Sequence, residues 1–353
     1  MWRISRPESA GILDSEGVKA ALPRYVDIVR GKKYPKFQIA QSIPCEFKRR
    51  ADPEELWSIN DQCIEGVQES VKKPKKVDRS LLDLKIRIAH QIMQDCRFCE
   101  RRCGADRLHG DKGYCKAGRN FSLFSAFPHM GEEPELVPSG TIFTGGCSIR
   151  CIHCQNWDIS QWHSNGISLT PEMMALQVSE LVENGCRNIN MVGGDPTPYV
   201  WHWLETMNNV KPSIATVWNS NSYYSLETAK LLAGFIDLYL LDFKYGNNKC
   251  AIEISDAPGY WKAATRNHLW ANKYGELIIR VLVLPEHNEC CTRPILQWIH
   301  DNLGPMSRVN LMFQYRPEWR ASERHELRRR LNQKEISEVK KIAEEIGLIN
   351  LVK

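Results

Sequence analysis

The chain has 353 residues with a net charge of +5, and 42% of its residues are hydrophobic. That length and apolar content suffice for one large α/β domain or two smaller ones, and the charge is too evenly mixed to indicate nucleic-acid binding. The N-terminal residues lack the apolar core of a signal peptide, and no stretch approaches the ~20 apolar residues of a membrane span. We therefore expect a cytoplasmic protein.

Residues 1–90 are predicted to form a mixed, partly helical N-terminal extension. A helical stretch near 53–72 leads into the basic connector Lys72-Lys73-Pro74-Lys75-Lys76, which we interpret as a solvated linker rather than a binding patch. A second helical stretch, Leu81 to Met93, follows the connector. No internal repeat or low-complexity tract accompanies these elements.

Cysteine is unusually frequent, with thirteen residues in the chain. Disulfides are not expected in a reducing compartment, and seven of the thirteen fall into two dense clusters, which is typical of metal chemistry. The other six are interpreted as buried or incidental thiols. These six are Cys45, Cys63, Cys186, Cys250, Cys290 and Cys291.

The first cluster lies in residues 91–130 and is predicted to be a four-cysteine metal-binding knuckle. Its sulfurs belong to Cys96, Cys99, Cys103 and Cys115. Four thiolates suit either structural zinc or a second iron–sulfur cluster, and the spacing does not decide between them. Nearby arginines would offset the negative charge of such a site. Four reduced thiols without metal are the third alternative.

The second cluster places Cys147, Cys151 and Cys154 in one tight loop. Spacings of three and two residues let three thiolates converge on three corners of a cubane iron–sulfur cluster and leave the fourth iron without a protein ligand. An electron carrier saturates its cluster with four thiolates, and structural zinc closes a tetrahedron. The spacing therefore favours a cluster whose open iron binds a substrate or cofactor.

Residues 131–320 alternate between strand and helix signals, and residues 321–353 are predicted to form a C-terminal helical segment. Six strand–helix units imply a parallel sheet with right-handed crossovers, either a partial (β/α)6 barrel or an open doubly wound sheet. The predicted strands are 141–144, 188–192, 214–218, 238–242, 277–283 and 309–313.

Polar or glycine residues follow almost every predicted strand. Because barrels assemble their sites at the carboxyl ends of the strands, this pattern favours the partial barrel over the open sheet. Glycines allow close backbone approach, and a carboxylate can accept hydrogen bonds from an ammonium group. The residues concerned are Gly193, Gly194, Asp195, Asn219, Asn221, Asp242, Lys244, Arg280 and Tyr315.

The three-cysteine spacing resembles that of the radical S-adenosylmethionine (SAM) superfamily. Residues 141 to about 317 look like the pyruvate formate-lyase activating enzymes, and from about Cys96 onward the chain is most similar to poorly characterised homologues of those activators. The resemblance implies a [4Fe-4S] cluster on Cys147, Cys151 and Cys154 that cleaves SAM reductively. The product would be a 5′-deoxyadenosyl radical that abstracts hydrogen from a substrate.

The resemblance also implies roles for the residues at the strand ends. The turn Gly193-Gly194-Asp195 would contact the SAM amino group, and the segments 219–221 and 242–244 would lie near its methionine moiety. Arg280 would face inward, Tyr315 would belong to a segment that closes over the cofactor, and the backbone of His153 would meet adenine. Four departures accompany these matches: Asp195 replaces a Glu, Asn219 replaces an Asp, His153 replaces an aromatic residue, and the extra cysteines precede the three-cysteine loop.

Partners follow from the same resemblance. An external electron donor such as flavodoxin or ferredoxin would reduce the cluster. A protein, such as a glycyl-radical enzyme, is the first expectation for the substrate, with RNA or a small molecule as alternatives. A hypothesis of a different class is a metal-binding interaction protein without catalysis, which would leave the polar strand ends unexplained.

Overall fold

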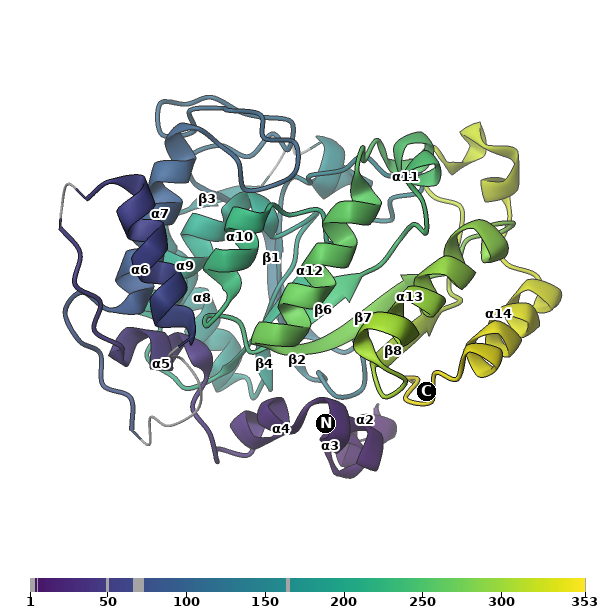
Figure 1. The fold of residues 1–353 in the computed structure, drawn as a ribbon, viewed down its shortest axis with the longest axis horizontal. Coiled ribbons are helices and arrows are strands. Elements are labelled where there is room, and N and C mark those ends of the chain that lie inside the picture. Colours follow the sequence, from purple (N-terminus) through teal and green to yellow (C-terminus); the bar gives the residue numbers. More distant parts are fainter. Residues whose placement is uncertain (1–3, 5, 49–50, 66–72, 163–165, 353) are drawn as a thin grey trace.

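The computed structural model describes residues 4, 6–48, 51–65, 73–162 and 166–352. Its centre is an eight-stranded sheet with the order β3-β1-β2-β4-β5-β6-β7-β8 (Figure 1). The strands are β1 (Phe121–His129), β2 (Ser139–Thr144), β3 (Ile167–Leu169), β4 (Asn188–Met191), β5 (Ala215–Ser220), β6 (Leu238–Asp242), β7 (Glu276–Leu282) and β8 (Arg308–Met312).

The six strands from β2 to β8, apart from β3, are parallel and lie side by side in chain order. A doubly wound sheet reverses its strand order once, whereas here the order never reverses. Right-handed crossovers in one direction put all connecting helices on one face and curl the sheet toward a barrel. The six predicted strands and the partial barrel are thus confirmed.

The helices that follow the parallel strands cover the outer face of the sheet, and the earlier helices lie at its first edge and lower end (Figure 1). Thr170 and Ser225 cap two of the outer helices by accepting hydrogen bonds from the backbone. The helices are α2 (Pro7–Gly11), α3 (Glu16–Ala21), α4 (Pro23–Val29), α5 (Lys36–Ser42), α6 (Pro53–Glu65), α7 (Leu81–Gln94), α8 (Pro171–Glu183), α9 (Val200–Asn209), α10 (Leu226–Leu232), α11 (Asn248–Ser255), α12 (Tyr260–Tyr274), α13 (Arg293–Leu303) and α14 (Gln333–Ile346).

Two antiparallel strands, β1 and β3, extend the sheet beyond β2 and were not predicted from the sequence. The register of β1 against β2 shifts between Leu123 and Ser125, which interrupts the alternation that identifies a strand. β3 has only three residues, and its partner β1 lies about forty positions earlier in the chain. Neither signal is strong enough to be read locally.

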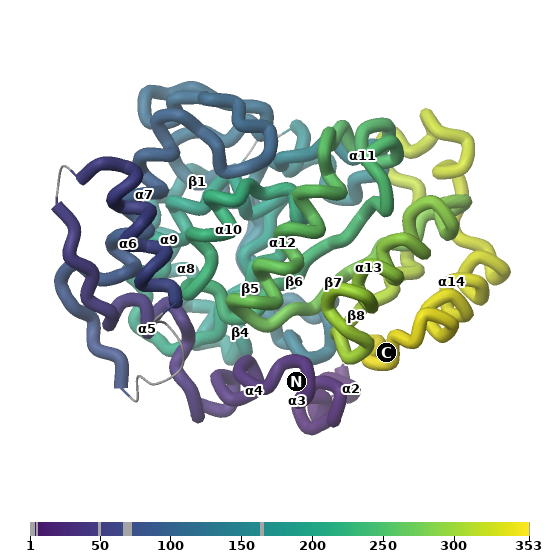
Figure 2. Tube along the Cα trace, in the orientation of Figure 1, coloured from purple at the N-terminus to yellow at the C-terminus, as the bar shows by residue number. Residues whose placement is uncertain are grey.

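The N-terminal helices fill the lower half of the barrel interior. Leu13 and Val18 pack with Val217 of β5, Leu240 of β6 and Ile278 of β7 in one buried cluster. The tube view follows this segment, with α3 and α4 lying across the lower end of the sheet (Figure 2). We call the N-terminal residues of this cluster the plug; they are Leu13, Val18, Leu22, Tyr25, Val26 and Ile28. Because side chains alternate along a strand, the next inward positions on β5, β6 and β7 lie above the plug, and these are 219, 242 and 280.

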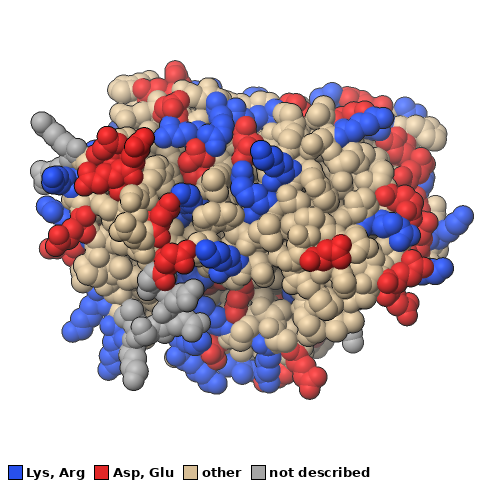
Figure 3. Space-filling model, viewed as in Figure 1, with Lys and Arg blue, Asp and Glu red and all other residues tan. Residues whose placement is uncertain are grey.

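The predicted helical stretch near 53–72 ends as α6 at Glu65, and 66–72 lie outside the described residues. The same holds for Lys72 of the basic connector. Lys73 and Lys75 are exposed, in agreement with a solvated linker. Acidic and basic side chains are interspersed over the face shown in Figure 3. Among the described residues, no helix has the length and apolar character needed to cross a membrane.

Candidate functional site

The three-cysteine loop follows β2 and is fixed by backbone hydrogen bonds to α11. The amides of Arg150 and Ile152 donate to the carbonyls of Ser255 and Ile254 at 2.8 and 3.0 Å. Gly146 opens the loop with a φ of +88°, a conformation that side chains other than glycine rarely adopt. The loop therefore has one fixed shape that directs its cysteines into the barrel.

Each sulfur of the loop has a polar neighbour. Asn221 Nδ2 lies 3.4 Å from the Sγ of Cys147, and Ser255 Oγ lies 2.9 Å from that of Cys151. Cys154 Sγ lies 3.2 Å from the hydroxyl of Ser160. Hydrogen bonds to sulfur tune and support cluster thiolates. Ser255 and Ser160 were not singled out from the sequence, because a serine carries no signal until the fold brings it to a sulfur.

Burial raises the pKa of the loop thiols. The pKa of Cys147 lies well above its ordinary value through burial and the nearby Asp195 carboxylate, and burial raises that of Cys151 to about 11. Thiolates in such a place need a cation beside them. Loading with iron supplies that positive charge, and the donor set fits the cluster implied by the spacing.

The three sulfurs line a cavity of about 230 Å³ at the carboxyl ends of the strands. The cavity brings together twelve of the thirteen predicted catalytic and cofactor-contacting positions from the loop and five successive strand ends, with Asp195 as the exception. Its walls include Cys147, Cys151, His153, Cys154, Gly193, Gly194, Asn219, Asn221, Asp242, Lys244, Arg280 and Tyr315.

The glycine turn after β4 packs directly on the loops beside it. A Cβ on Gly193, whose φ is +121°, would lie 2.3 Å from the carbonyl oxygen of Thr144. A Cβ on Gly194 would lie 2.3 Å from the carbonyl oxygen of Gly146. Only glycines permit this contact. Because the same two glycines also line the cavity, we call this turn the glycine cradle.

Asp195 is buried behind the cavity wall and joins two strand ends. Its carboxylate accepts hydrogen bonds from the amide of Thr197 at 2.9 Å, from Ser220 Oγ at 3.0 Å and from the amide of Asn221 at 2.9 Å. Burial raises its pKa above the ordinary value, and these donors partly offset that effect. Its carboxylate thus fixes the turn against the end of β5.

Part of the cavity wall is a half-buried charge network at the ends of β6 and β7. Asp242 accepts from Arg280 Nε and pairs with Lys244 Nζ, both at 2.7 Å. Burial alone would raise the pKa of Asp242, but Arg280 and Lys244 outweigh it and hold the pKa below its ordinary value. Arg280 also donates to the side-chain oxygen of Asn219. Arg280 pairs with Glu132 as well, at 3.8 Å, so its guanidinium lies between two carboxylates.

His153 and Tyr315 close the side of the cavity next to the third cysteine. Their rings meet edge to face with centroids 5.8 Å apart. Burial and the neighbouring Lys244 lower the pKa of His153 to about 3, so its imidazole is neutral. The imidazole Nε2 lies 3.3 Å from the hydroxyl of Tyr245.

The four-cysteine knuckle lies between α7 and β1 and contacts the three-cysteine loop. Arg101 Nε donates to the carbonyl of Ser148 at 3.2 Å, and Arg150 donates to the carbonyl of Tyr114. Cys99 forms an isolated antiparallel bridge with Tyr224, after β5. Cys96 and Cys115 are buried, Cys99 is half-buried and Cys103 is exposed.

A third group of metal-ligand atoms was missed from the sequence. Cys250, His287, Cys290 and Cys291 place their ligand atoms within 4.8 Å of one another. The sequence analysis interprets all three cysteines of this group as buried or incidental thiols. The available signal was His287 three positions before the pair Cys290-Cys291, but the fourth member lies about forty positions earlier, after a different strand.

Comparison with known proteins agrees with this geometry. The family description "Radical SAM superfamily" matches residues 141–299. The chain is 39% identical over 336 residues to the uncharacterized protein MJ0674 of Methanocaldococcus jannaschii, covering 93% of this chain and 98% of that one. A second uncharacterized protein of that organism, MJ0808, is 24% identical over 59% of this chain and 67% of its own.

Among solved structures, Streptococcus suis SuiB bound to its precursor peptide SuiA is similar with a TM-score of 0.42 and 14% identity. That match covers 58% of this chain and 46% of SuiB, so the chain spans less than half of that structure's length. The family match runs from within β2 to within α13 and includes the three-cysteine loop, the glycine turn and most of the cavity lining, whereas Tyr315 lies beyond it. The chain belongs to the radical SAM superfamily, whose members use a [4Fe-4S] cluster and SAM.

Proposed function

We propose that this protein cleaves SAM reductively at a [4Fe-4S] cluster and abstracts hydrogen from a substrate. The observation that carries the proposal is the convergence of Cys147, Cys151 and Cys154 on one cavity with the polar ends of five strands. When bound, the cluster and SAM supply an electron transfer to the sulfonium that yields methionine and a 5′-deoxyadenosyl radical. The alternative of a non-catalytic metal-binding protein gives no reason for this cavity.

The chain's residues would hold and orient the cofactor. The backbone of Gly193 and Gly194 is open for the amino group of SAM, and Asp195 fixes the turn through its three hydrogen bonds. Lys244 and Arg280 are cations that line the cavity, and we assign them to the SAM carboxylate. We assign Asn219, Asn221 and Asp242 to the methionine end and His153 and Tyr315 to the adenine end.

For the substrate we propose a protein segment, as for the glycyl-radical activating enzymes that the chain resembles. Trp157 and Trp319 stack with centroids 4.4 Å apart, and Trp162 packs edge-on against both while remaining 55% exposed. The cavity-lining residues Gln155 and Asn156 directly precede Trp157. Exposed aromatic groups of this kind are common where proteins bind proteins. RNA or a small molecule is the second candidate.

The remaining assignments are proposals of the same kind. We assign a second metal, zinc or iron–sulfur, to the knuckle of Cys96, Cys99, Cys103 and Cys115, and reduction to an external donor such as flavodoxin or ferredoxin. We divide the chain into an N-terminal extension (1–90), the knuckle (91–130), the radical SAM partial barrel (131–320) and a C-terminal helical segment (321–353).

The test is anaerobic reconstitution followed by electron paramagnetic resonance. Adding SAM should shift the signal of the reduced cluster, and dithionite should then give 5′-deoxyadenosine and methionine in equal amounts. An unshifted signal together with the absence of deoxyadenosine would refute the proposal. Asp195→Ala should bind SAM more weakly by about 1.5–3 kcal/mol and keep its iron, whereas Asp195→Asn, which retains one acceptor, should lose less.

A further inference from the structure

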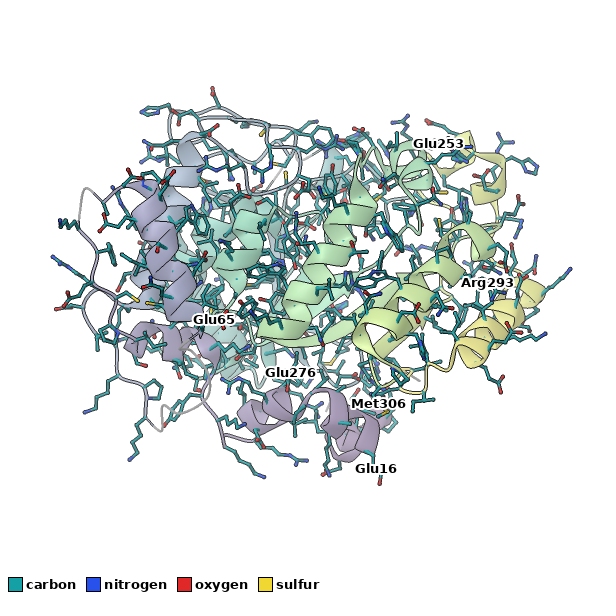
Figure 4. The ribbon with its side chains drawn as sticks, in the orientation of Figure 1. Glu16, Glu65, Glu253, Glu276, Arg293 and Met306 are labelled. Atoms are coloured by element: carbon teal, nitrogen blue, oxygen red, sulfur yellow. The ribbon has the colours of Figure 1, made fainter. Side chains whose placement is uncertain are left out.

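The loops after β6 and β7 bring together one histidine and three cysteines beside the barrel. Cys250 lies in the first turn of α11, and His287 precedes the short π-helix Asn288–Thr292, which carries Cys290 and Cys291 and leads into α13. In Figure 4, Glu253 on α11 and Arg293 at the start of α13 mark the two elements that bracket the group.

The separations of the ligand atoms are those of a single tetrahedral ion. His287 Nδ1 lies 3.7 Å from Cys250 Sγ, 3.3 Å from Cys290 Sγ and 3.9 Å from Cys291 Sγ. Cys290 Sγ lies 3.9 Å from Cys250 Sγ and 4.0 Å from Cys291 Sγ. Zn–S bonds of about 2.3 Å and Zn–N bonds of about 2.0 Å put tetrahedral sulfurs about 3.8 Å apart and a sulfur and a nitrogen about 3.5 Å apart.

The atoms around this group support thiolates and a bound imidazole. Asn247 Nδ2 lies 3.3 Å from Cys250 Sγ and 3.8 Å from Cys291 Sγ, so its amide can donate to both sulfurs. The other ring nitrogen of His287, Nε2, lies 3.6 Å from a carboxylate oxygen of Glu326. A carboxylate behind a metal-bound histidine fixes the tautomer that leaves the first nitrogen free for the ion.

From this arrangement we propose that Cys250, His287, Cys290 and Cys291 bind one zinc ion, separate from the radical SAM cluster and from the knuckle. Four protein ligands close the tetrahedron, which is the pattern of a structural rather than a catalytic zinc site. A multi-iron cluster suits the group less well, because its thiolates bind different irons and lie farther apart. Cys290 is exposed and provides the path by which the ion enters.

The ion would tie the loop after β6 to the loop after β7. These are the loops that follow Asp242 and Arg280, the two partners in the charged wall of the cavity. A Cβ on Gly246 would lie 2.6 Å from the carbonyl oxygen of Cys291, so the two backbones already touch. Zinc at this site would hold together the two loops that follow Asp242 and Arg280, without contacting SAM.

Metal analysis of the full-length protein tests the site. The wild type and the triple variant Cys147→Ala, Cys151→Ala, Cys154→Ala should both contain the zinc, and the double variant Cys250→Ser, Cys290→Ser should contain one equivalent less per chain with unchanged iron. Cys186→Ser, which removes a buried thiol outside the group, should keep all of its zinc. Equal zinc in the double variant and the wild type, or a loss of iron in place of zinc, would overturn the proposal.

A conservative variant separates metal loss from misfolding. His287→Cys keeps four ligands and should retain a full equivalent of zinc, and after cobalt exchange its tetrahedral visible spectrum should shift as nitrogen is replaced by sulfur. In the wild type, Cys290 should resist alkylation until a chelator removes the ion. Rapid alkylation of Cys290 that zinc does not slow, or a cobalt spectrum unchanged by His287→Cys, would count against the site.

Discussion

The two halves of the barrel interior are built on the same strands and differ in what fills them. On β5, β6 and β7 the lower inward positions are apolar and pack against the plug, as with Val217, Leu240 and Ile278. Two residues farther along each strand, Asn219, Asp242 and Arg280 line the cavity. The same strand therefore provides packing at one end and polar contacts at the other, and each half can be disturbed without the other.

Removing the loop cysteines should have the largest effect, confined to the open half. Cys147→Ala, Cys151→Ala or Cys154→Ala leaves one iron without its thiolate, so deoxyadenosine formation should fall to the background level. Product can be measured by liquid chromatography after anaerobic reduction. Cys186→Ser should retain activity, and turnover by any of the three loop variants would contradict the assignment.

Neutralising Asp242 should destabilise the charged wall. Asp242→Asn removes the carboxylate that the partly buried Lys244 and Arg280 share, which we expect to cost about 1.5–3 kcal/mol of unfolding free energy and to slow SAM cleavage. Denaturant unfolding measures the first effect. Asp301→Asn, on the exposed end of α13, should change stability by about 0.5 kcal/mol or less.

The double variant Asp242→Asn, Lys244→Met sharpens that test, because it also removes the cation whose carboxylate partner among the described residues is Asp242. It should recover part of the lost stability. If the double variant were less stable than Asp242→Asn by the full cost of a second independent change, the three side chains would not act as one network.

The glycine cradle should tolerate no added methyl group. In Gly194→Ala the new Cβ would press on the backbone of Gly146 and Ser160, and overpacking of this kind costs about 1–3 kcal/mol. We expect SAM affinity to fall by about 5- to 150-fold, measured by anaerobic titration. Gly11→Ala faces open space at the end of α2 and is the control. Equal SAM affinities in Gly194→Ala and Gly11→Ala would show that the glycine cradle is not part of the SAM site.

The plugged half should show the smallest effect, a change of stability with pH. Glu276 accepts hydrogen bonds from the amides of Arg24 and Tyr25 at the start of α4, and it lies where α4 meets the end of the sheet (Figure 4). Burial raises its pKa from 4.5 to about 7, although the two amides oppose this effect. Between pH 4.5 and about pH 7 the Glu276 carboxyl binds more proton in the folded than in the unfolded protein. The raised pKa therefore stabilises the fold at low pH, and this stabilisation is lost as pH rises through about 7.

Measured against Glu276→Gln, the wild type should therefore be more stable at pH 5.5 than at pH 8 by about 2 kcal/mol. Glu16→Gln, on the exposed side of α3, should show no such difference. A wild-type protein that gains stability relative to Glu276→Gln on going from pH 5.5 to pH 8 would reverse the sign and contradict the raised pKa.

Much of the open half could be predicted because its signals are local. The cysteine spacing is contiguous, and the polar residues follow strands that their apolar runs reveal. The surroundings of Asp195 could not be predicted, because only the fold brings Ser220 and the amide of Asn221 to its carboxylate. The plug could not be predicted either. The alternation of side chains along a strand distinguishes its two faces, but it does not show which segment packs against each face.

The same physical limit explains the cysteines that were set aside. Cys250 and Cys290 are forty positions apart, and no spacing rule connects a residue after one strand with a residue after the next. Their partnership arises because parallel strands place successive loops side by side at one edge of the sheet. Sequence patterns detect sites carried by one loop more readily than sites shared between loops.

The plug also sets the order in which the molecule can be completed. Its residues are made first, but the strands that they contact, up to β7, are made more than two hundred positions later. Asn350 donates to the carbonyl of Gly17 across 333 positions. At synthesis rates of about 5–20 residues per second, the N-terminal helices wait for roughly 20 to 70 s before that contact can form. During this time their apolar side chains lack the strands that cover them in the folded protein.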